Sequence, residues 1–254
     1  MREMYYDSHE RYKEFLVRFS DCDYTSRAHL SSLFRFMEET TVADFVGRDC
    51  SFQRILSAGY AVLLSRQKIR LTHYPVEGEM LKVDTWTKKI SGKVAWRDFS
   101  IKDLSGSVVA QGTSSWILVS MKTGRAVDFS EFPFPECIAM RKEEALDEKL
   151  DLLPPGEGGR VLYARPARYT DLDMYRHVNH CKLVEWVMDS FDLAELRARP
   201  IVSLQMNYVS QVTFGEVTNI VRFDDSRHHT VLFGIDAKNP ELVRFQARVG
   251  FSGT

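Results

Sequence analysis

The sequence predicts an α+β protein in which one unit occurs twice, each copy being an antiparallel sheet curled around one long helix. Three observations predict this: short motifs that recur along the chain, one helical apolar pattern in each half, and several strand-like stretches after each helix. A single helix cannot cover an open sheet with its one apolar face, so the sheet has to curl around the helix.

The internal repeat is seen in three pairs of segments. Residues 18–23 (RFSDCD) return as residues 168–173 (RYTDLD), and residues 111–116 are matched by residues 246–251. Between them, the motif Ser-x-Gln occurs at Ser65 and again at Ser203. The offset between the copies falls from 150 to 138 and then to 135 residues, as we expect if the second copy has the shorter loops.

Each copy contains one predicted helix, at residues 29–48 and 177–197. Side chains that can form a buried face recur there at positions i, i+3, i+4 and i+7, the spacing of one helical stripe. These positions are Leu30, Leu33, Phe34 and Met37 in the first helix and His180, Leu183, Val184 and Val187 in the second. Each helix therefore has one face that packs against a sheet.

Strand-like stretches follow each helix. They are rich in Val, Ile, Phe, Trp and Thr, and turn residues such as Gly92, Gly106 and Pro240 bound them. The expected strands are 60–74, 80–91, 93–103 and 106–121 in the first half, and 201–211, 215–223, 228–237 and 241–251 in the second. Each half is therefore a strand, one long helix and an antiparallel meander.

A curled antiparallel sheet around one long helix is the hotdog fold, so the sequence predicts a tandem, or double, hotdog. The stretch at about 151–159 is rich in Pro and Gly, which fit neither helix nor sheet, and is the expected linker. The expected domains are an N-terminal hotdog at residues 1–150 and a C-terminal hotdog at residues 160–254. Two tandem hotdogs would reproduce in one chain the two-fold dimer that hotdog proteins usually form.

The composition excludes several classes of protein. The chain has 34 Lys and Arg residues against 35 Asp and Glu residues, a formal net charge of -1, which does not favour a nucleic acid or an anionic membrane as partner. Its four cysteines are widely spaced and are expected to be free thiols in a reducing compartment. We find neither the apolar core of a secretory signal nor an apolar run of ~18 residues, so we expect a cytoplasmic protein.

The densest polar cluster lies where the second copy enters its helix, at Asp171, Asp173, Tyr175, His177, Asn179 and His180. A carboxylate four residues before an imidazole suits hydrolysis, because the carboxylate can activate water or attack an acyl carbon itself. Amide groups of the expected first helical turn, around residues 177–179, would stabilise an oxyanion. The alternative is structural: either aspartate can cap the helix, and His177 can be a packed, hydrogen-bonded side chain.

The run 171–179 (DLDMYRHVN), with the helix sequence LVEW at 183–186, resembles the signature of the acyl-acyl-carrier-protein (acyl-ACP) thioesterases of plants and bacteria. These are double-hotdog enzymes of fatty acid synthesis. Segments 36–40, 83–86, 97–98 and 114–116 resemble the N-terminal half of the family. The resemblance implies hydrolysis of a fatty acyl-ACP thioester, which releases free fatty acid and ends chain elongation. It implies a carrier protein with a fatty acyl-phosphopantetheine as partner, and neither a cofactor nor a metal ion.

Carried over by position, Asp173 is the principal catalytic carboxylate and His177 its partner, while Asn179 fixes the thioester. Two positions differ from the family pattern. Tyr175 stands where the family usually has Asn. Gln211 stands where the family usually has Glu, three residues after Tyr208, at which a strand is expected to begin. A neutral Gln cannot act as a base, but it can hold a water molecule or the thioester oxygen by hydrogen bonds.

The first half is expected to bind the acyl chain rather than to carry chemistry. Its loop has Asp23, but Arg27 occupies the place of His177, and His29 lies two residues out of register. A fatty chain needs an apolar slot, which we expect along part of the first helix. That helix face contains Leu33, Phe34, Met37 and Phe45.

Two other functions stay open. An acyl-CoA thioesterase fits the shorter D-x-x-x-H-V-N core, and a non-catalytic acyl-binding or regulatory protein fits the changes at Tyr175 and Gln211. A homodimer is an open question of oligomeric state. Basic side chains that would face an acidic carrier are Lys88, Lys89, Lys93, Arg160, Arg165 and Arg168.

Overall fold

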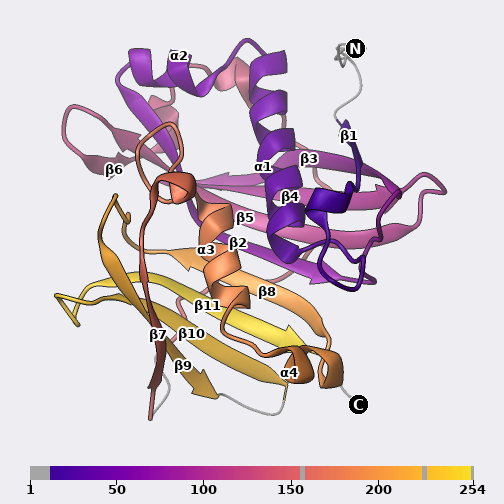
Figure 1. The fold of residues 1–254 in the computed structure, drawn as a ribbon. Helices are drawn as coiled ribbons and strands as arrows, with labels where there is room; N and C mark the ends of the chain where they lie inside the picture. The colour runs from indigo at the N-terminus through magenta and orange to yellow at the C-terminus, as the bar shows by residue number, and fades with distance from the viewer. Residues whose placement is uncertain (1–11, 155–157, 225–227, 253–254) are drawn as a thin grey trace. The chain divides into compact units, whose positions relative to one another are not determined.

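The computed structural model describes residues 12–154, 158–224 and 228–252, and Figure 1 shows its helices and strands. The chain divides into two compact units, the first formed by residues up to 64 and 72–148, the second by residues 65–71 and from 149 onward. Residues 155–157 of the expected linker lie outside the described residues. None of the helices in the described part of the chain has the length and apolar character that a bilayer crossing requires.

The first unit is an antiparallel sheet with one long helix against it. Its strands are β1 (Tyr12–Leu16), β2 (Tyr60–Leu71), β3 (Met80–Ser91), β4 (Val94–Asp103), β5 (Val108–Ser120) and β6 (Arg125–Val127). They follow the order β1-β3-β4-β5-β2, with β6 paired to β5. The helices are α1 (Leu30–Gly47) and the short α2 (Phe52–Ser57), and 3-10 turns lie at Phe19–Asp21, Phe129–Glu131 and Pro135–Cys137.

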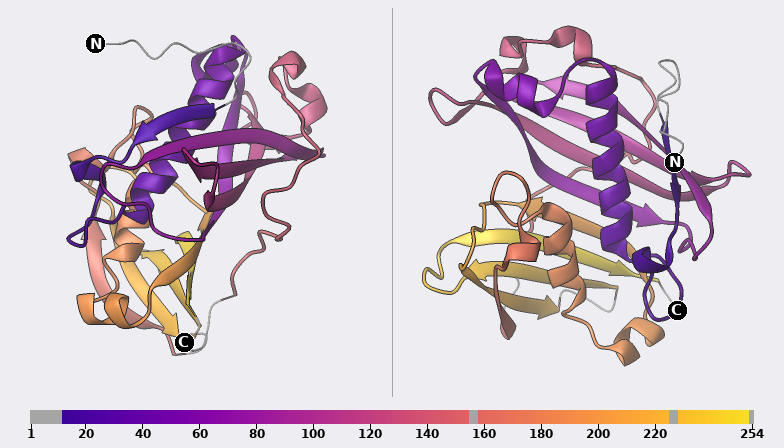
Figure 2. Two further views of the ribbon diagram at one scale, coloured as in Figure 1. Left: turned by 90° about the vertical axis from the view of Figure 1, so that its right-hand side faces the viewer. Right: turned by 45° about the horizontal axis from the view of Figure 1, so that its top comes forward.

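Helix α1 forms the centre of the first unit, as its apolar spacing predicts. Leu30, Leu33, Phe34 and Met37 are all buried, and α1 packs against β1 and β3. Figure 2 shows α1 lying along one face of its own sheet. The helix begins one residue later and ends one residue earlier than predicted.

The second unit repeats this plan with shorter elements. It contains β7 (Arg160–Pro166), a 3-10 turn (Tyr169–Asp171), α3 (His180–Met188), α4 (Leu193–Ala198), β8 (Ile201–Tyr208), β9 (Val217–Asp224), β10 (His229–Asp236) and β11 (Val243–Phe251). Residues 66–70 of β2 pair with β8, and the order continues as β8-β11-β10-β9-β7. The two Ser-x-Gln strands thus lie side by side and antiparallel, with Arg66 opposite Asn207 and Ile69 opposite Leu204.

The predicted single helix at 177–197 is wrong, because the chain forms two helices there. The Ser190 hydroxyl donates to the Trp186 carbonyl at 3.3 Å and ends the first one. The Asp192 carboxylate then accepts the Glu195 amide at 2.7 Å and caps the second. Arg222 of β9 holds this second helix to the sheet with hydrogen bonds of 2.9 and 2.6 Å to Glu195.

Buried amide side chains attach the start of the expected linker to the second unit. Gln246 accepts the Leu153 amide at 3.2 Å and donates to its carbonyl at 2.9 Å. Gln205 and Asn207 each donate to the Asp151 carbonyl at 3.0 Å. The Leu153 side chain is buried beside Phe233. Residues 151–153 are therefore a packed part of the second unit rather than a loose connection.

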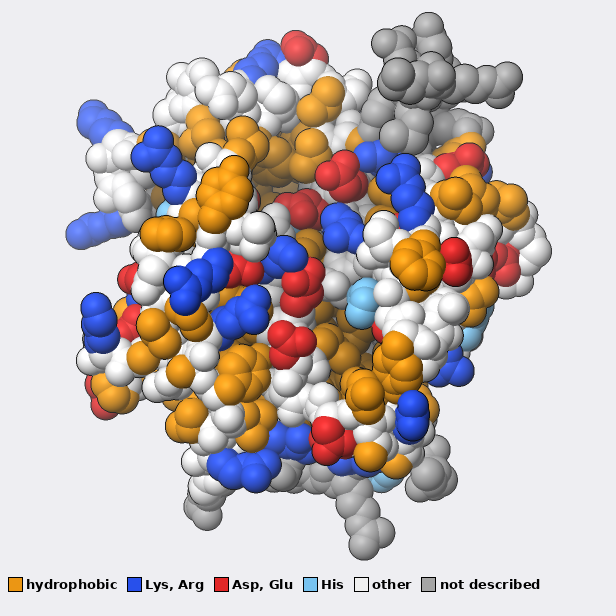
Figure 3. Space-filling model, viewed as in Figure 1, with side chains coloured by type: hydrophobic (Ala, Val, Ile, Leu, Met, Phe, Trp, Pro, Cys, Tyr) orange, Lys and Arg blue, Asp and Glu red, His pale blue; other side chains and the backbone are white. Residues whose placement is uncertain are grey.

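Surface and cysteine chemistry agree with the composition. All four cysteines are free thiols, as predicted. Charged side chains of both signs are interspersed over the face shown in Figure 3, in keeping with a net charge of -1.

Candidate active site

The polar cluster of the second unit is a tight loop organised by Asp173. Its Oδ1 atom accepts the amides of Tyr175 at 2.8 Å and His177 at 3.2 Å. The Asp173 amide donates to the His177 carbonyl at 2.8 Å. Arg176 adopts a left-handed backbone, with φ of 66°, to close the loop. Asp173 and His177 are thereby fixed next to each other, both half-buried.

The first unit contains the same loop without the histidine. Asp23 Oδ1 accepts the amides of Thr25 at 2.7 Å and Arg27 at 3.3 Å. The Asp23 amide donates to the Arg27 carbonyl at 2.8 Å, and Ser26 has φ of 61°. Arg27 therefore occupies the place of His177, as predicted. Both aspartates build a loop, so this structural role is independent of any catalytic one.

The predicted oxyanion site at the amides of residues 177–179 is wrong. His177 donates to the Asp173 carboxylate, Val178 donates to the Val212 carbonyl at 2.9 Å, and Asn179 donates to the Asp171 carbonyl at 2.8 Å. These amides also precede helix α3, which starts at His180. An oxyanion in this site would need donors other than these three amides.

Helix α3 is capped by Asn179, so the prediction that either aspartate caps it is wrong. Asn179 Oδ1 accepts the Cys181 amide at 2.7 Å. Asp171 instead accepts the Arg168 amide at 2.7 Å and is almost fully buried. Its side chain holds the preceding 3-10 turn together.

Gln211 lies on the segment beside this loop. Strand β8 ends at Tyr208, so the prediction that Tyr208 opens a strand is wrong, and Gln211 is an exposed residue of the turn that follows. The next residues reach the loop: the Val212 carbonyl accepts the Val178 amide, and Thr213 forms an antiparallel bridge with His177. The backbone thus brings the Gln211 segment next to His177, as the family resemblance implies.

Tyr175 lies at the exposed tip of the loop. Its side chain is 42% exposed. Partial burial and the nearby Asp173 charge raise the pKa of Tyr175 above its ordinary value. Its phenol therefore stays protonated near neutral pH and can donate a hydrogen bond.

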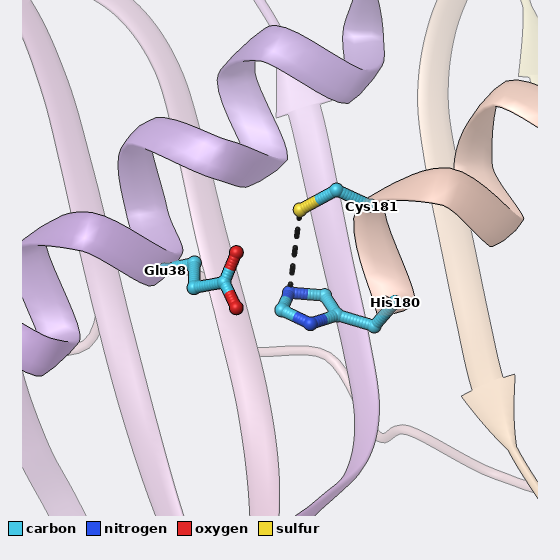
Figure 4. A group of neighbouring side chains, drawn as sticks. All are labelled: Glu38, His180 and Cys181. Atoms are coloured by element: carbon cyan, nitrogen blue, oxygen red, sulfur yellow. Dashed lines mark hydrogen bonds between the residues drawn. The ribbon is translucent and has the colours of Figure 1, made fainter. Parts of the chain in front are cut away.

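His180, which ends the predicted polar cluster, pairs with Cys181, a contact that the sequence did not indicate. Figure 4 shows them at the start of α3, with Cys181 Sγ 3.5 Å from His180 Nε2. The His180 ring also meets the Tyr208 ring edge-on, with centroids 5.7 Å apart. The sequence places His180 both at the end of the polar cluster and on the apolar face of the helix. The signal that it differs was its imidazole at a position where the first copy has Leu30.

The first unit contains an apolar pocket. Its lining residues are Phe45, Val62, Thr87, Ile90, Ala95, Arg97, Trp116, Phe129, Phe132 and Ile138. Of the predicted acyl-binding face of α1, Phe45 lines this pocket, whereas Leu33, Phe34 and Met37 are fully buried in the core. The structure thus separates pocket from core on this helix, which the sequence pattern does not.

One wall of this pocket has a buried charge pair. Arg97 donates to Asp44 at 2.8 Å and to the Thr85 hydroxyl at 3.2 Å. Burial lowers the pKa of Arg97, and the Asp44 carboxylate opposes this shift. The guanidinium lies 5.1 Å from the Phe45 ring centroid. The pair anchors α1 to β4 beside the pocket.

The basic side chains predicted to face a carrier are not equivalent. Lys88 lies 3.2 Å from Asp98, donates to the Leu146 carbonyl at 2.7 Å, and is largely buried. Its assignment to a carrier-facing surface is therefore wrong. Arg160 and Arg168 are exposed.

Comparison with known proteins identifies the family over most of the chain. The model of the acyl-ACP thioesterase N-terminal domain matches residues 9–131, and that of the C-terminal domain matches residues 162–246. An acyl-[acyl-carrier-protein] hydrolase from Cuphea viscosissima, a chloroplastic protein, is 24% identical over 219 residues, which are 76% of this chain and 49% of that protein. The chain spans about half the length of the curated relatives it matches.

Solved structures confirm the predicted double hotdog. An acyl-ACP thioesterase from Bacteroides thetaiotaomicron has a TM-score of 0.87 at 20% identity and covers 95% of this chain and 97% of its own. The 12:0-ACP thioesterase from Umbellularia californica has a TM-score of 0.83 at 17% identity, with coverage of 97% and 99%. Both halves match models of a single family, and the chain therefore belongs to the acyl-ACP thioesterase family.

Proposed function

We propose that this protein hydrolyses the thioester of a fatty acyl-ACP to free fatty acid and carrier thiol. The observation that carries this proposal is the Asp173–His177 loop with Gln211 on the adjoining segment, inside the part of the chain that matches the family's C-terminal domain. The carrier as partner and the cytoplasmic location stay predictions.

Asp173 is proposed as the group that starts the reaction. Its two amide bonds both go to Oδ1, which leaves Oδ2 to activate a water molecule or to attack the thioester carbon directly. Attack forms a tetrahedral oxyanion, which collapses with release of the carrier thiolate. If water attacks, this step gives the free fatty acid; if Asp173 attacks, it leaves a mixed anhydride with the aspartate, which water then hydrolyses to fatty acid and free carboxylate. His177, held by its own backbone to Asp173, orients the water or delivers a proton to the departing sulfur.

Side chains are proposed to stabilise the oxyanion, because the amides of residues 177–179 already have acceptors in the protein. The Gln211 amide group and the Tyr175 phenol are the neutral donors of this site, and they stand where the family usually has Glu and Asn. Asn179 acts mainly through its cap, which fixes the start of α3. A site with neutral donors favours water positioning and oxyanion binding over a second general base.

The pocket of the first unit is proposed to hold the fatty chain. Aromatic and aliphatic side chains dominate its lining, and an acyl chain is stabilised there by removal from water. This assigns acyl binding to the N-terminal hotdog at residues 1–150 and chemistry to the C-terminal hotdog at residues 160–254.

A thiol-release assay with a panel of acyl-ACPs tests the proposal. The protein should release carrier thiol and the matching free fatty acid in equal amounts. A second candidate, a non-catalytic acyl-binding protein, is favoured by the loop of Asp23, because that loop shows that Asp173 has a structural reason to be present. Saturable binding of acyl-ACP without release of thiol would establish it.

A further inference from the structure

Arg244 of β11 is a buried cation next to the candidate site. It is 7% exposed. Its Nη2 atom donates to Glu216 at 2.8 Å and to Asp236 at 2.5 Å, and its Nη1 atom donates to the Gln211 carbonyl. A guanidinium can make these contacts at once because its donors form a rigid planar fork.

The turn at 209–216 is bonded to Arg244 on one side and to the His177 loop on the other. The amides of Val209 and Ser210 donate to the Arg244 carbonyl, each at 3.0 Å. The Thr213 amide donates to Glu216 at 2.6 Å, and Glu216 is itself held by the guanidinium. On the far side, residues 212 and 213 pair with the segment at 177–178.

The first unit contains the equivalent turn without the arginine. Val109 takes the place of Arg244, and its carbonyl accepts the amides of Thr72 and His73. Glu79 accepts the Val76 amide at 3.0 Å, as Glu216 accepts that of Thr213. A buried valine is therefore enough for this turn to form, and the arginine occurs in the copy that has His177.

Two carboxylates, those of Glu216 and Asp236, bind the single Arg244 cation. Its hydrogen bond lowers the pKa of Asp236. Burial acts to raise the pKa of Glu216, but hydrogen bonds from the Thr213 amide and Arg244 outweigh it. The pKa of Glu216 therefore lies below its ordinary value. Both acids are thus ionised at neutral pH and hold the cation between them. Taking these charges out of water costs free energy, which only close geometry and additional hydrogen bonds offset.

We infer that Arg244 is a positioning residue, which fixes the 209–216 turn and through it places Gln211 and His177 for thioester hydrolysis. This inference rests on the proposed function for its kinetic consequence. The consequence for the turn itself is independent of activity.

The test compares Arg244→Val, the residue found in the first copy, with Arg244→Lys and with the control Arg222→Val. Arg222 is a partly buried arginine of the same unit, and its guanidinium binds Glu195 at the start of α4. Thiol release from one acyl-ACP gives kcat and KM, urea unfolding gives stability, and hydrogen exchange reports the Val178 and Thr213 amides.

Arg244→Val should lower kcat by about 10- to 100-fold with KM changed by less than about threefold, because binding of the acyl chain is elsewhere. Exchange of the Val178 amide should become at least about tenfold faster. Arg244→Lys should recover part of kcat, and Arg222→Val should lose stability with kcat within about threefold of the parent protein. A folded Arg244→Val protein with parental kcat would overturn the inference. A loss of kcat in proportion to the loss of stability, in both Arg244→Val and Arg222→Val, would also overturn it.

Hydrogen exchange separates failure of this inference from failure of the proposed function. If the parent protein releases no thiol, the proposed hydrolysis is wrong, and the exchange data alone decide about Arg244. Faster exchange at Val178 in Arg244→Val but not in Arg222→Val then supports positioning of the turn. Unchanged exchange at Val178 contradicts it.

Discussion

The duplicated loop allows the catalytic role of Asp173 to be separated from its structural role. Asp173→Asn and Asp23→Asn remove the same carboxylate charge from two loops with the same pair of backbone contacts. Asparagine keeps an oxygen acceptor for both amides, so each loop should still form. The two variants should therefore have similar stability and different activity.

The stability change follows from the hydrogen bonds. A bond to a charged group contributes about 1.5–3 kcal/mol and a neutral one about 0.5–1.5 kcal/mol, so loss of charge costs about 1 kcal/mol per bond. Each aspartate accepts two amides and is only half-buried, which gives about 1–2 kcal/mol from these bonds for either variant. Asp23 also accepts the Thr25 hydroxyl at 2.6 Å, which adds at most about 1 kcal/mol to the loss in Asp23→Asn. Removal of a principal catalytic group should in addition lower turnover about 100-fold or more in Asp173→Asn alone.

Urea unfolding and thiol release from one acyl-ACP measure both quantities on the same preparations. We expect similar unfolding midpoints for the two variants, a near-parental kcat for Asp23→Asn, and a kcat lowered by two orders of magnitude or more for Asp173→Asn. Turnover in Asp173→Asn within about threefold of the parent would refute the catalytic role of Asp173. Equal losses of turnover in both variants would show that the two aspartates affect activity only by stabilising their loops.

Three further predictions concern the rest of the site. Gln211→Ala should raise the barrier by about 2–3 kcal/mol, and Gln211→Glu should add an acidic limb to the pH dependence of kcat/KM; three superimposable pH profiles for the parent and both variants would remove Gln211 from the site. Ala95→Phe should shift the acyl-ACP preference to shorter chains, by about 0.8 kcal/mol per excluded methylene, and an unchanged chain-length profile would place the acyl chain elsewhere. Arg97→Met should destabilise the protein by about 3 kcal/mol in urea unfolding, because Asp44 keeps only Arg48 as partner in its buried position, and a loss below about 1 kcal/mol would contradict the importance of that pair.

Much of the fold could be predicted because the pattern of apolar residues repeats with the chain. Strands β3, β4, β5 and β11 lie within two residues of their expected bounds, and α1 within one. In these elements local preference, burial and pairing favour the same structure. The repeat added the architecture, because two copies of one helix-and-meander pattern allow few other folds.

The second helix shows where the pattern is insufficient. Apolar spacing continues past Met188, but Ser190 and Asp192 bond to the backbone and end one helix and start the next. Their effect depends on local hydrogen-bond competition, which a hydrophobic period does not include. The same side chains are visible in the sequence, so a capping residue inside a predicted helix is the signal to use.

The candidate site could be located from the sequence, but the hydrogen bonds of its groups could not. The motif identified Asp173 and His177 correctly as neighbours. The acceptors of the amides at 177–179 include the Val212 carbonyl, which is brought there by tertiary pairing of distant segments. Arg244 was missed, although aligning the repeats at an offset of 135 residues places it against Val109 and would have indicated it.

The ratio of kcat/KM for an acyl-ACP to that for the acyl-CoA with the same chain tests the central claim most directly. The proposed function predicts that kcat/KM for thiol release is at least about tenfold higher with the acyl-ACP than with the acyl-CoA, a difference of about 1.4 kcal/mol. An equal or larger kcat/KM on acyl-CoA would contradict the assignment of the carrier. Saturable binding of acyl-ACP with no thiol released would contradict hydrolysis itself.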